Sequence, residues 1–202
     1  MRYPNGKKES VHTKTLDNYA RRGMSLEDDI NTTNNDYLSN DLAIIHKKPT
    51  PITIVKVDYP TRSKAKICEA YFKLPSTTDY NGIYKGKYID FEAKECLSKT
   101  SFPFASIHPH QIKHLSDVIR HGAIAFIIIR MTNYGLDYLI DAKEFIDYYN
   151  LQKRKSLPYA WIKENGHLIQ YKYQRPCDYL KIVDEIYEMW KLWKKEKLIQ
   201  KK

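Results

Sequence analysis

Hydrophobic and polar residues alternate strictly between positions 88 and 94, and this pattern predicts a β-strand with two unlike faces. Ile89 and Phe91 can pack in a core from one face, while Glu92 and Lys94 share the opposite face, two positions apart. A carboxylate beside an ammonium group is a poor choice for a core and a useful one for catalysis. The polar face as a whole comprises Tyr88, Asp90, Glu92 and Lys94.

Further helices and strands are predicted on both sides of this strand. Ser25 begins a helix with a capping-box-like start, in which Asp28 takes the place of the usual Glu or Gln. Another helix runs from His110 to Arg120, and the apolar run 123–129 predicts a strand covered on both faces. Strand, helix, strand and strand from residue 88 onward indicate a mixed α/β sheet with helices packed against it. The expected buried face of the first helix comprises Leu26, Ile30, Tyr37 and Leu38. Shorter strands are expected near 42–46, 138–140 and 167–171. Helices are expected at 142–149 and from 178 to about 197, and the apolar face of the second helix includes Trp190 and Trp193. The stretch 151–174 is basic and is expected to be largely irregular.

A long ribbon of two strands is predicted over residues 52–72, with a basic turn at 60–64. Basic and aromatic side chains are interleaved along it, a composition that can hold phosphates and stack on exposed bases. A solvated edge hairpin is the alternative interpretation.

Length and charge restrict the class of protein. The 202 residues suit one domain with a full core, and the net charge of +10 favours a polyanionic partner. Ribosomal, membrane-surface and DNA-binding proteins share this bias, so charge alone does not identify the partner. The longest apolar run has seven residues, against the ~20 that a spanning helix needs, and no apolar signal segment is visible. We therefore expect a cytoplasmic protein without a membrane partner.

The cysteines and the N-terminus add little chemistry. Cys68, Cys96 and Cys177 are scattered and odd in number, which supports neither a disulfide framework nor a zinc site. Residues 1–22 are polar and are expected to be a flexible basic arm, which either contacts phosphates or is a tail without a role. The remainder, 23–202, is expected to be a single domain.

Candidate chemistry centres on Asp79, Glu92 and Lys94. Asp79 precedes Glu92 by thirteen residues, across a turn-rich segment that contains Asn81-Gly82 and Gly86. If that segment folds back, the two carboxylates can share a divalent cation such as Mg²⁺. Lys94 can orient an attacking water or stabilise negative charge. This is the active-site arrangement of the PD-(D/E)xK nucleases, although a surface strand with an ion pair would show the same bare pattern.

Longer segments around this pattern are more specific. Those that stand out, in order, are residues 22–29 (RGMSLEDD), 46–51 (HKKPTP), 69–73 (EAYFK), 76–86 (STTDYNGIYKG), 88–95 (YIDFEAKE), 99–103 (KTSFP) and 110–111 (HQ). Together they resemble the RecU family of bacterial Holliday junction resolvases, from about residue 2 to the end and most strongly between 21 and 111. The resemblance implies a restriction-endonuclease-like fold, a homodimer and Mg²⁺-dependent cleavage of four-way DNA junctions in recombination and repair.

The resemblance also assigns roles to individual residues. It implies a metal site of Thr77, Asp79, Glu92 and Gln111, with Lys94 as the transition-state stabiliser and Mn²⁺ as a substitute for Mg²⁺. Thr77 and Gln111 come from the resemblance alone. It further implies a stalk at about 58–76 that enters the junction centre. The protein partners that it implies are the RecA recombinase and the RuvAB branch-migration proteins, and the location that it implies is the nucleoid. The expected junction contacts are Lys66, Tyr71, Phe72 and Lys73.

Three alternatives are compatible with the sequence. Glu27 can join the active site or stabilise a helix N-terminus. A sequence-specific restriction-type nuclease acting on linear duplex shares the same carboxylate pattern. A non-catalytic junction-binding module that recruits recombination proteins does not need Asp79, Glu92 and Lys94 together, so their joint presence counts against it.

Overall fold

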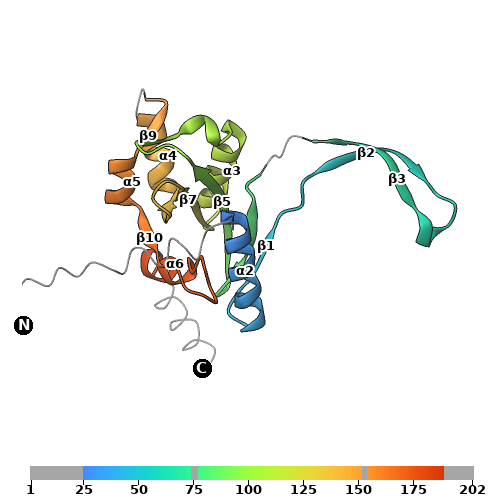
Figure 1. Ribbon diagram of the computed structural model, residues 1–202, viewed down its shortest axis with the longest axis horizontal. Helices are drawn as coiled ribbons and strands as arrows, with labels where there is room; N and C mark the ends of the chain where they lie inside the picture. The colour runs from blue at the N-terminus through green and yellow to red at the C-terminus, as the bar shows by residue number, and fades with distance from the viewer. Residues whose placement is uncertain (1–24, 74–76, 152–153, 189–202) are drawn as a thin grey trace, which may run out of the picture.

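The computed structural model describes residues 25–73, 77–151 and 154–188 (Figure 1). Its centre is a six-stranded sheet in the order β1-β4-β5-β7-β8-β10. The β5 and β7 strands are parallel and the other neighbours are antiparallel, so the sheet is mixed. The six strands are β1 (Ile44–Lys47), β4 (Tyr80–Tyr84), β5 (Lys87–Cys96), β7 (Ile124–Met131), β8 (Leu136–Asp141) and β10 (His167–Ile169).

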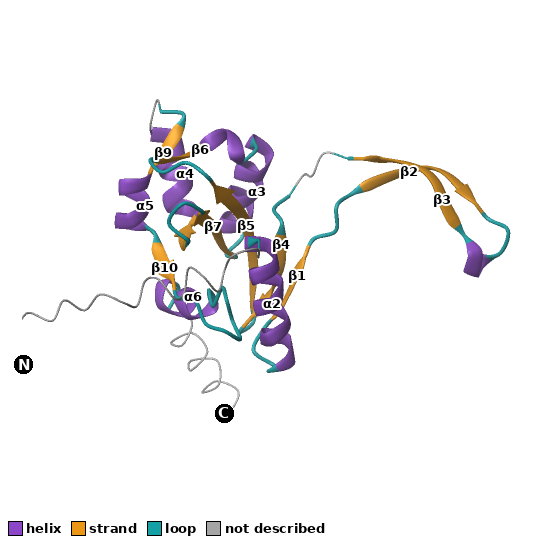
Figure 2. Ribbon diagram, viewed as in Figure 1, coloured by secondary structure: helices purple, strands orange, loops and turns teal. Residues whose placement is uncertain are grey.

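Helices cover both faces of this sheet (Figure 2). The alternation of side chains along β7 explains the two layers, because Phe126 and Ile128 enter one hydrophobic cluster and Ile127 and Ile129 enter the other. The first cluster is completed by α2 (Leu26–Ser39) and α6 (Leu180–Ile186), and the second by α3 (Pro109–Arg120), α4 (Ala142–Leu151) and α5 (Tyr159–Asn165). The smaller elements are η2 (Phe104–Ser106) and the pair β6 (Ser101–Pro103) and β9 (Ser156–Pro158).

A two-stranded hairpin projects far from the sheet (Figure 1). It consists of β2 (Ile52–Asp58), the short helix η1 (Arg62–Lys64) and β3 (Lys66–Phe72). Every residue of both strands is exposed, so backbone pairing rather than burial holds the hairpin together. It leaves the domain after β1 and returns before β4, and these strands are neighbours in the sheet. The two ends of the hairpin, which we call its roots, therefore lie next to each other at the sheet. The expected mixed α/β fold with a projecting hairpin is confirmed.

Several expected elements agree with the structure in detail. The Ser25 side chain accepts a hydrogen bond from the Asp28 backbone, and the Asp28 side chain accepts one from Ser25, which confirms the capping box. The helix after Pro109 ends at Arg120, and β7 is buried along its whole length. Among the described residues, no helix combines the length and the apolar character that crossing a membrane would require.

Of the two turn signals expected between Asp79 and Glu92, Gly86 lies in the turn, but Asn81 and Gly82 do not. Both residues lie within β4. A Cβ atom on Gly82 would stand 2.0 Å from the carbonyl oxygen of Ile44, so glycine allows β1 and β4 to approach closely. The turn instead occupies Lys85 and Gly86, whose φ values of 46° and 75° match the tight hairpin type with two left-handed residues.

Two further expectations need correction. Leu38 is 50% exposed and does not belong to the buried face of α2. The stretch 151–174 contains β9, α5 and β10, so it is less irregular than its composition indicates. The N-terminal arm, Trp190 and Trp193 lie outside the described residues.

Candidate active site

The strand register brings Asp79 to Glu92. Tyr80 on β4 pairs with Phe91 on β5, and their rings stack in the core with centroids 4.9 Å apart. The next pair in this register is Asp79 with Glu92, both on the side opposite to the two rings. The ammonium group of Lys94 forms an ion pair with Glu92 and lies 3.4 Å from Asp79 Oδ2. The structure thus brings together the three residues that the sequence pattern selected.

Burial dominates the electrostatics of this group. The Glu92 side chain has no exposed surface, and this desolvation raises its pKa to about 8. The neighbouring carboxyl of Asp79 also raises the pKa of Glu92, whereas Lys94 opposes the rise. Burial lowers the pKa of Lys94, but the two carboxylates outweigh it and the net shift is upward. Above about pH 8, where Glu92 is charged, two carboxylates and one ammonium group leave a local excess of negative charge.

The donor set fits a hard divalent cation. The Glu92 carboxylate is fully buried, and its charge is met by the ion pair with Lys94, beside the carboxyl group of Asp79. A buried carboxylate left in this way is unfavourable unless a further positive charge joins it. No cluster of three His, Cys, Asp or Glu side chains suited to a metal occurs in the part of the chain that the structure describes. Two carboxylates suit Mg²⁺, which retains several of its waters.

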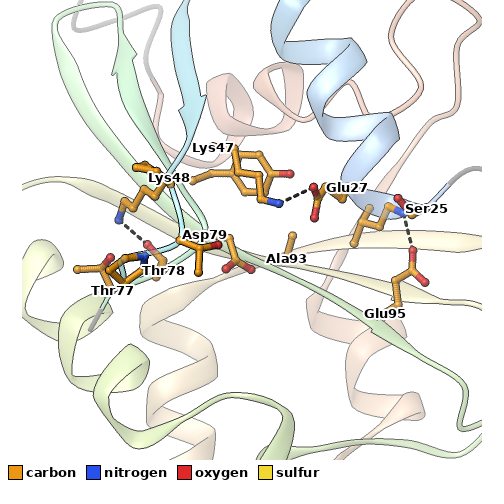
Figure 3. A pocket seen from close by; sticks show the side chains of 14 residues that line it. Ser25, Glu27, Lys47, Lys48, Thr77, Thr78, Asp79, Ala93 and Glu95 are labelled. Carbon is orange, nitrogen blue, oxygen red and sulfur yellow. Dashed lines mark hydrogen bonds and ion pairs between the residues drawn. The ribbon is translucent and has the colours of Figure 1, made fainter. Parts of the chain in front are cut away.

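A pocket of about 500 Å³ adjoins the group (Figure 3). Asp79 lines the pocket, and so do Ala93 and Glu95 on one face of β5. Glu92 and Lys94 lie on the other face of this strand. The far wall is the N-terminus of α2, with Ser25, Leu26 and Glu27, and the remaining lining residues include Lys47, Lys48, Thr77 and Thr78.

Glu27 faces this pocket from α2. Its carboxylate forms an ion pair with Lys47, and both side chains are substantially exposed. Glu27 is therefore a pocket residue as well as one of the acidic residues in the first turn of α2. No hydrogen bond or ion pair joins it to Asp79 or Glu92 among the described residues.

The two ligands assigned by resemblance occupy different settings. Thr77 lines the pocket two positions before Asp79. Gln111 is buried in the first turn of α3, where its Oε1 accepts a 2.9 Å hydrogen bond from the His108 backbone. Within the described residues, no hydrogen bond links Gln111 to Asp79 or Glu92. An amide oxygen has two lone pairs, so the cap leaves one acceptor position on Gln111. Spacing in the sequence could not have indicated either residue as a ligand.

Sequence reasoning gave no role to Asp90, which the structure places at the centre of a second polar group. Asp90 is buried two positions before Glu92 and accepts hydrogen bonds from Lys48, Tyr88 and Thr78. His114 on α3 lies 3.1 Å from the same carboxylate. The available signal was its place on the polar face of β5.

The four expected junction contacts all lie on the β3 strand or directly after it. Lys66 lies beside the hairpin turn, while Phe72 pairs with Ile52 at the root. Phe72 is 83% exposed, and Tyr71 is exposed with its hydroxyl donating to Glu69 at 2.7 Å. The Lys73 backbone bonds to Pro51. The hairpin therefore presents aromatic and basic groups to solvent along its length.

Comparison with known proteins gives one consistent result. The family model described as RecU, Recombination protein U, matches residues 21–185. The Holliday junction resolvase RecU of Oceanobacillus iheyensis is 53% identical over 195 residues, which cover 93% of this chain and 100% of that protein. The Holliday junction resolvases RecU of Bacillus cereus strain G9842 and Bacillus cytotoxicus are 51% and 52% identical, each over 93% of this chain and 98% of the relative.

Proposed function

The chain belongs to the RecU family, and from this premise we propose that it is a Holliday junction resolvase, an endonuclease that cuts four-way DNA junctions. The observation that carries the proposal is the approach of Asp79, Glu92 and Lys94 to one another. Asp79 and Glu92, together with Thr77 and Gln111, would hold Mg²⁺, and Mn²⁺ would substitute for it.

The chemistry is hydrolysis of a phosphodiester. A bound Mg²⁺ supplies positive charge against the scissile phosphate and makes water a better nucleophile. Asp79 and Glu92 would bind the cation, and their carboxylates hold the Lys94 ammonium between them. The Lys94 ammonium stabilises the negative charge that grows on the phosphoryl oxygens. Water attacks phosphorus, the bond to the 3′ oxygen breaks, and the products are a 5′-phosphate and a 3′-hydroxyl.

Junction resolution requires two opposed nicks. A two-fold homodimer supplies two active sites that match the pseudo-symmetry of a four-way junction. The projecting hairpin selects the branched form by shape, with Lys66, Tyr71, Phe72 and Lys73 contacting phosphates and bases. The proposal includes RecA and RuvAB as protein partners and a cytoplasmic location at the nucleoid.

The test compares labelled four-way junctions with linear duplex of the same sequence, in Mg²⁺. We expect nicks in junctions only, and we expect Asp79→Ala to abolish nicking while leaving junction binding intact. Glu144→Ala is the matched control, since Glu144 lies on α4 outside the candidate site. Cleavage of linear duplex at defined sequences would move the protein to the restriction class. Tight junction binding without cleavage in Mg²⁺ or Mn²⁺ would leave an architectural module.

A further inference from the structure

Both roots of the projecting hairpin meet at one buried carboxylate, Asp90. Lys48 follows β1 on the outgoing root, and its ammonium nitrogen lies 2.8 Å from Asp90 Oδ2. Thr78 precedes β4 on the returning root, and its hydroxyl donates to Asp90 Oδ1. The Lys48 ammonium also donates to the Thr78 hydroxyl at 2.8 Å, as Figure 3 shows. The three side chains form a closed set of contacts that ties the two roots to β5.

Asp90 is fully used as an acceptor. The Tyr88 hydroxyl donates to Oδ2 at 2.8 Å, and His114 Nε2 lies 3.1 Å from the same oxygen. A buried carboxylate with this many partners is an organising group rather than an open ligand position. Asp90 thus differs from Glu92, which contacts the Lys94 ammonium and the Asp79 carboxyl group.

The same contacts fix the main chain of Asp79. Thr78 is its immediate neighbour in sequence, and the Lys48 backbone nitrogen donates a 2.8 Å hydrogen bond to the Asp79 carbonyl oxygen. Asp90 lies two residues before Glu92 on the same face of the strand. Lys48, Thr78 and Asp90 therefore link the main chain beside Asp79 to the strand that carries Glu92. The Asp79 side chain itself is 38% exposed and has a single ion-pair contact, at 3.4 Å to Lys94, within the described residues.

We propose that Lys48, Thr78 and Asp90 are positioning residues, which hold Asp79 opposite Glu92 so that the two carboxylates can bind one divalent cation. This inference rests on the proposed metal site. Groups that orient metal ligands typically change metal affinity or activity by about 10- to 100-fold when they are removed. We expect losses of this size, although none of the three residues touches the cation.

The direction in which cation affinity changes when Lys48 is replaced distinguishes positioning from simple electrostatics. Removing a positive charge near a cation site strengthens cation binding if electrostatics alone matters. If Lys48 acts by positioning Asp79, its removal weakens cation binding instead. Thr78→Val tests the same idea without any change of charge, because valine keeps the shape of threonine and lacks the hydroxyl.

The experiment measures Mn²⁺ affinity by calorimetry on the full chain without DNA, together with the Mg²⁺ concentration that gives half-maximal nicking. The variants are Lys48→Met, Thr78→Val and Asp90→Asn, each checked for folding by its thermal transition. The matched control is Lys85→Met, because Lys85 is a similarly buried lysine that pairs with Asp184 at 2.7 Å. We expect Lys48→Met and Thr78→Val to lose at least about 10-fold in Mn²⁺ affinity and to need correspondingly more Mg²⁺, while Lys85→Met stays near wild type.

Each outcome decides the proposal. Unchanged or stronger Mn²⁺ binding by folded Lys48→Met and Thr78→Val overturns it. If Asp90→Asn does not fold, the other two variants still give the answer. If the wild type binds Mn²⁺ but nicks no junction, the resolvase assignment fails and the affinity series still tests positioning. If the wild type binds no divalent cation, the metal site and this inference both fall.

Discussion

Replacing Glu92 with glutamine should stabilise the metal-free protein at alkaline pH. Burial raises the pKa of Glu92 from 4.5 to about 8, so its charged form is unfavourable in the folded state. A carboxyl whose folded pKa lies above its unfolded pKa contributes stability that is fully present below the unfolded pKa and is lost as pH rises through the folded pKa. For Glu92 that window runs from about pH 4.5 to about pH 8.

The size of the effect follows from this window. Each pKa unit corresponds to about 1.4 kcal/mol, so between pH 5 and pH 9 the wild type should lose on the order of 4 kcal/mol that the glutamine variant keeps. For a chain of this length, that difference corresponds to a melting temperature about 10 °C higher for the variant at pH 9. Near pH 5 the two proteins should melt almost together.

The assay is differential scanning calorimetry on protein treated with a chelator, over the range from pH 5 to pH 9. Glu95→Gln is the control, because Glu95 lies on the same strand with a 43% exposed side chain. Added Mg²⁺ should close the gap at pH 9, since a cation that binds the folded wild type stabilises it by mass action. A gap that is independent of pH, or a glutamine variant less stable than wild type at pH 9, would show that burial of a charged Glu92 does not destabilise the protein.

Three further predictions concern activity and DNA binding. Lys94→Met should lower the single-turnover nicking rate about 10²- to 10³-fold with unchanged junction affinity in a gel-shift assay, and a near-normal rate would remove Lys94 from the chemistry. Phe72→Ala should weaken junction binding by about 1–3 kcal/mol per stacked base. The thermal transition should not change, because the Phe72 side chain is 83% exposed. Equal junction affinity of the two proteins would contradict this role. Lys66→Ala should reduce the slope of log affinity against log salt by about 1, and an identical slope would show that Lys66 meets no phosphate.

The approach of Asp79, Glu92 and Lys94 to one another was predictable because it depends on local rules. Strand alternation puts Glu92 and Lys94 on one face, and antiparallel pairing with β4 places Asp79 opposite Glu92. The position of the turn was not predictable from composition. Asn81-Gly82 has the composition of a turn, but the close approach of Ile44 requires glycine there inside a strand.

The remaining differences depend on tertiary contacts. The helix α5 has seven residues, too few to be stable alone, and it forms because Ile162 is buried in the second hydrophobic cluster. The partners of Asp90 come from β1, from the segment before β4 and from α3, so sequence spacing could not connect them. Gln111 carries the ordinary signature of a helix cap, which hides any role as a ligand.

The most direct test of resolvase activity uses a supercoiled plasmid that extrudes a cruciform. Two opposed nicks made within one binding event linearise such a plasmid, whereas a single nick relaxes it and removes the junction. With Mg²⁺, we expect linear product with paired, symmetric 5′-phosphate ends, and none with Asp79→Ala. Accumulation of nicked circles alone, or cutting of a plasmid without the cruciform, would contradict it.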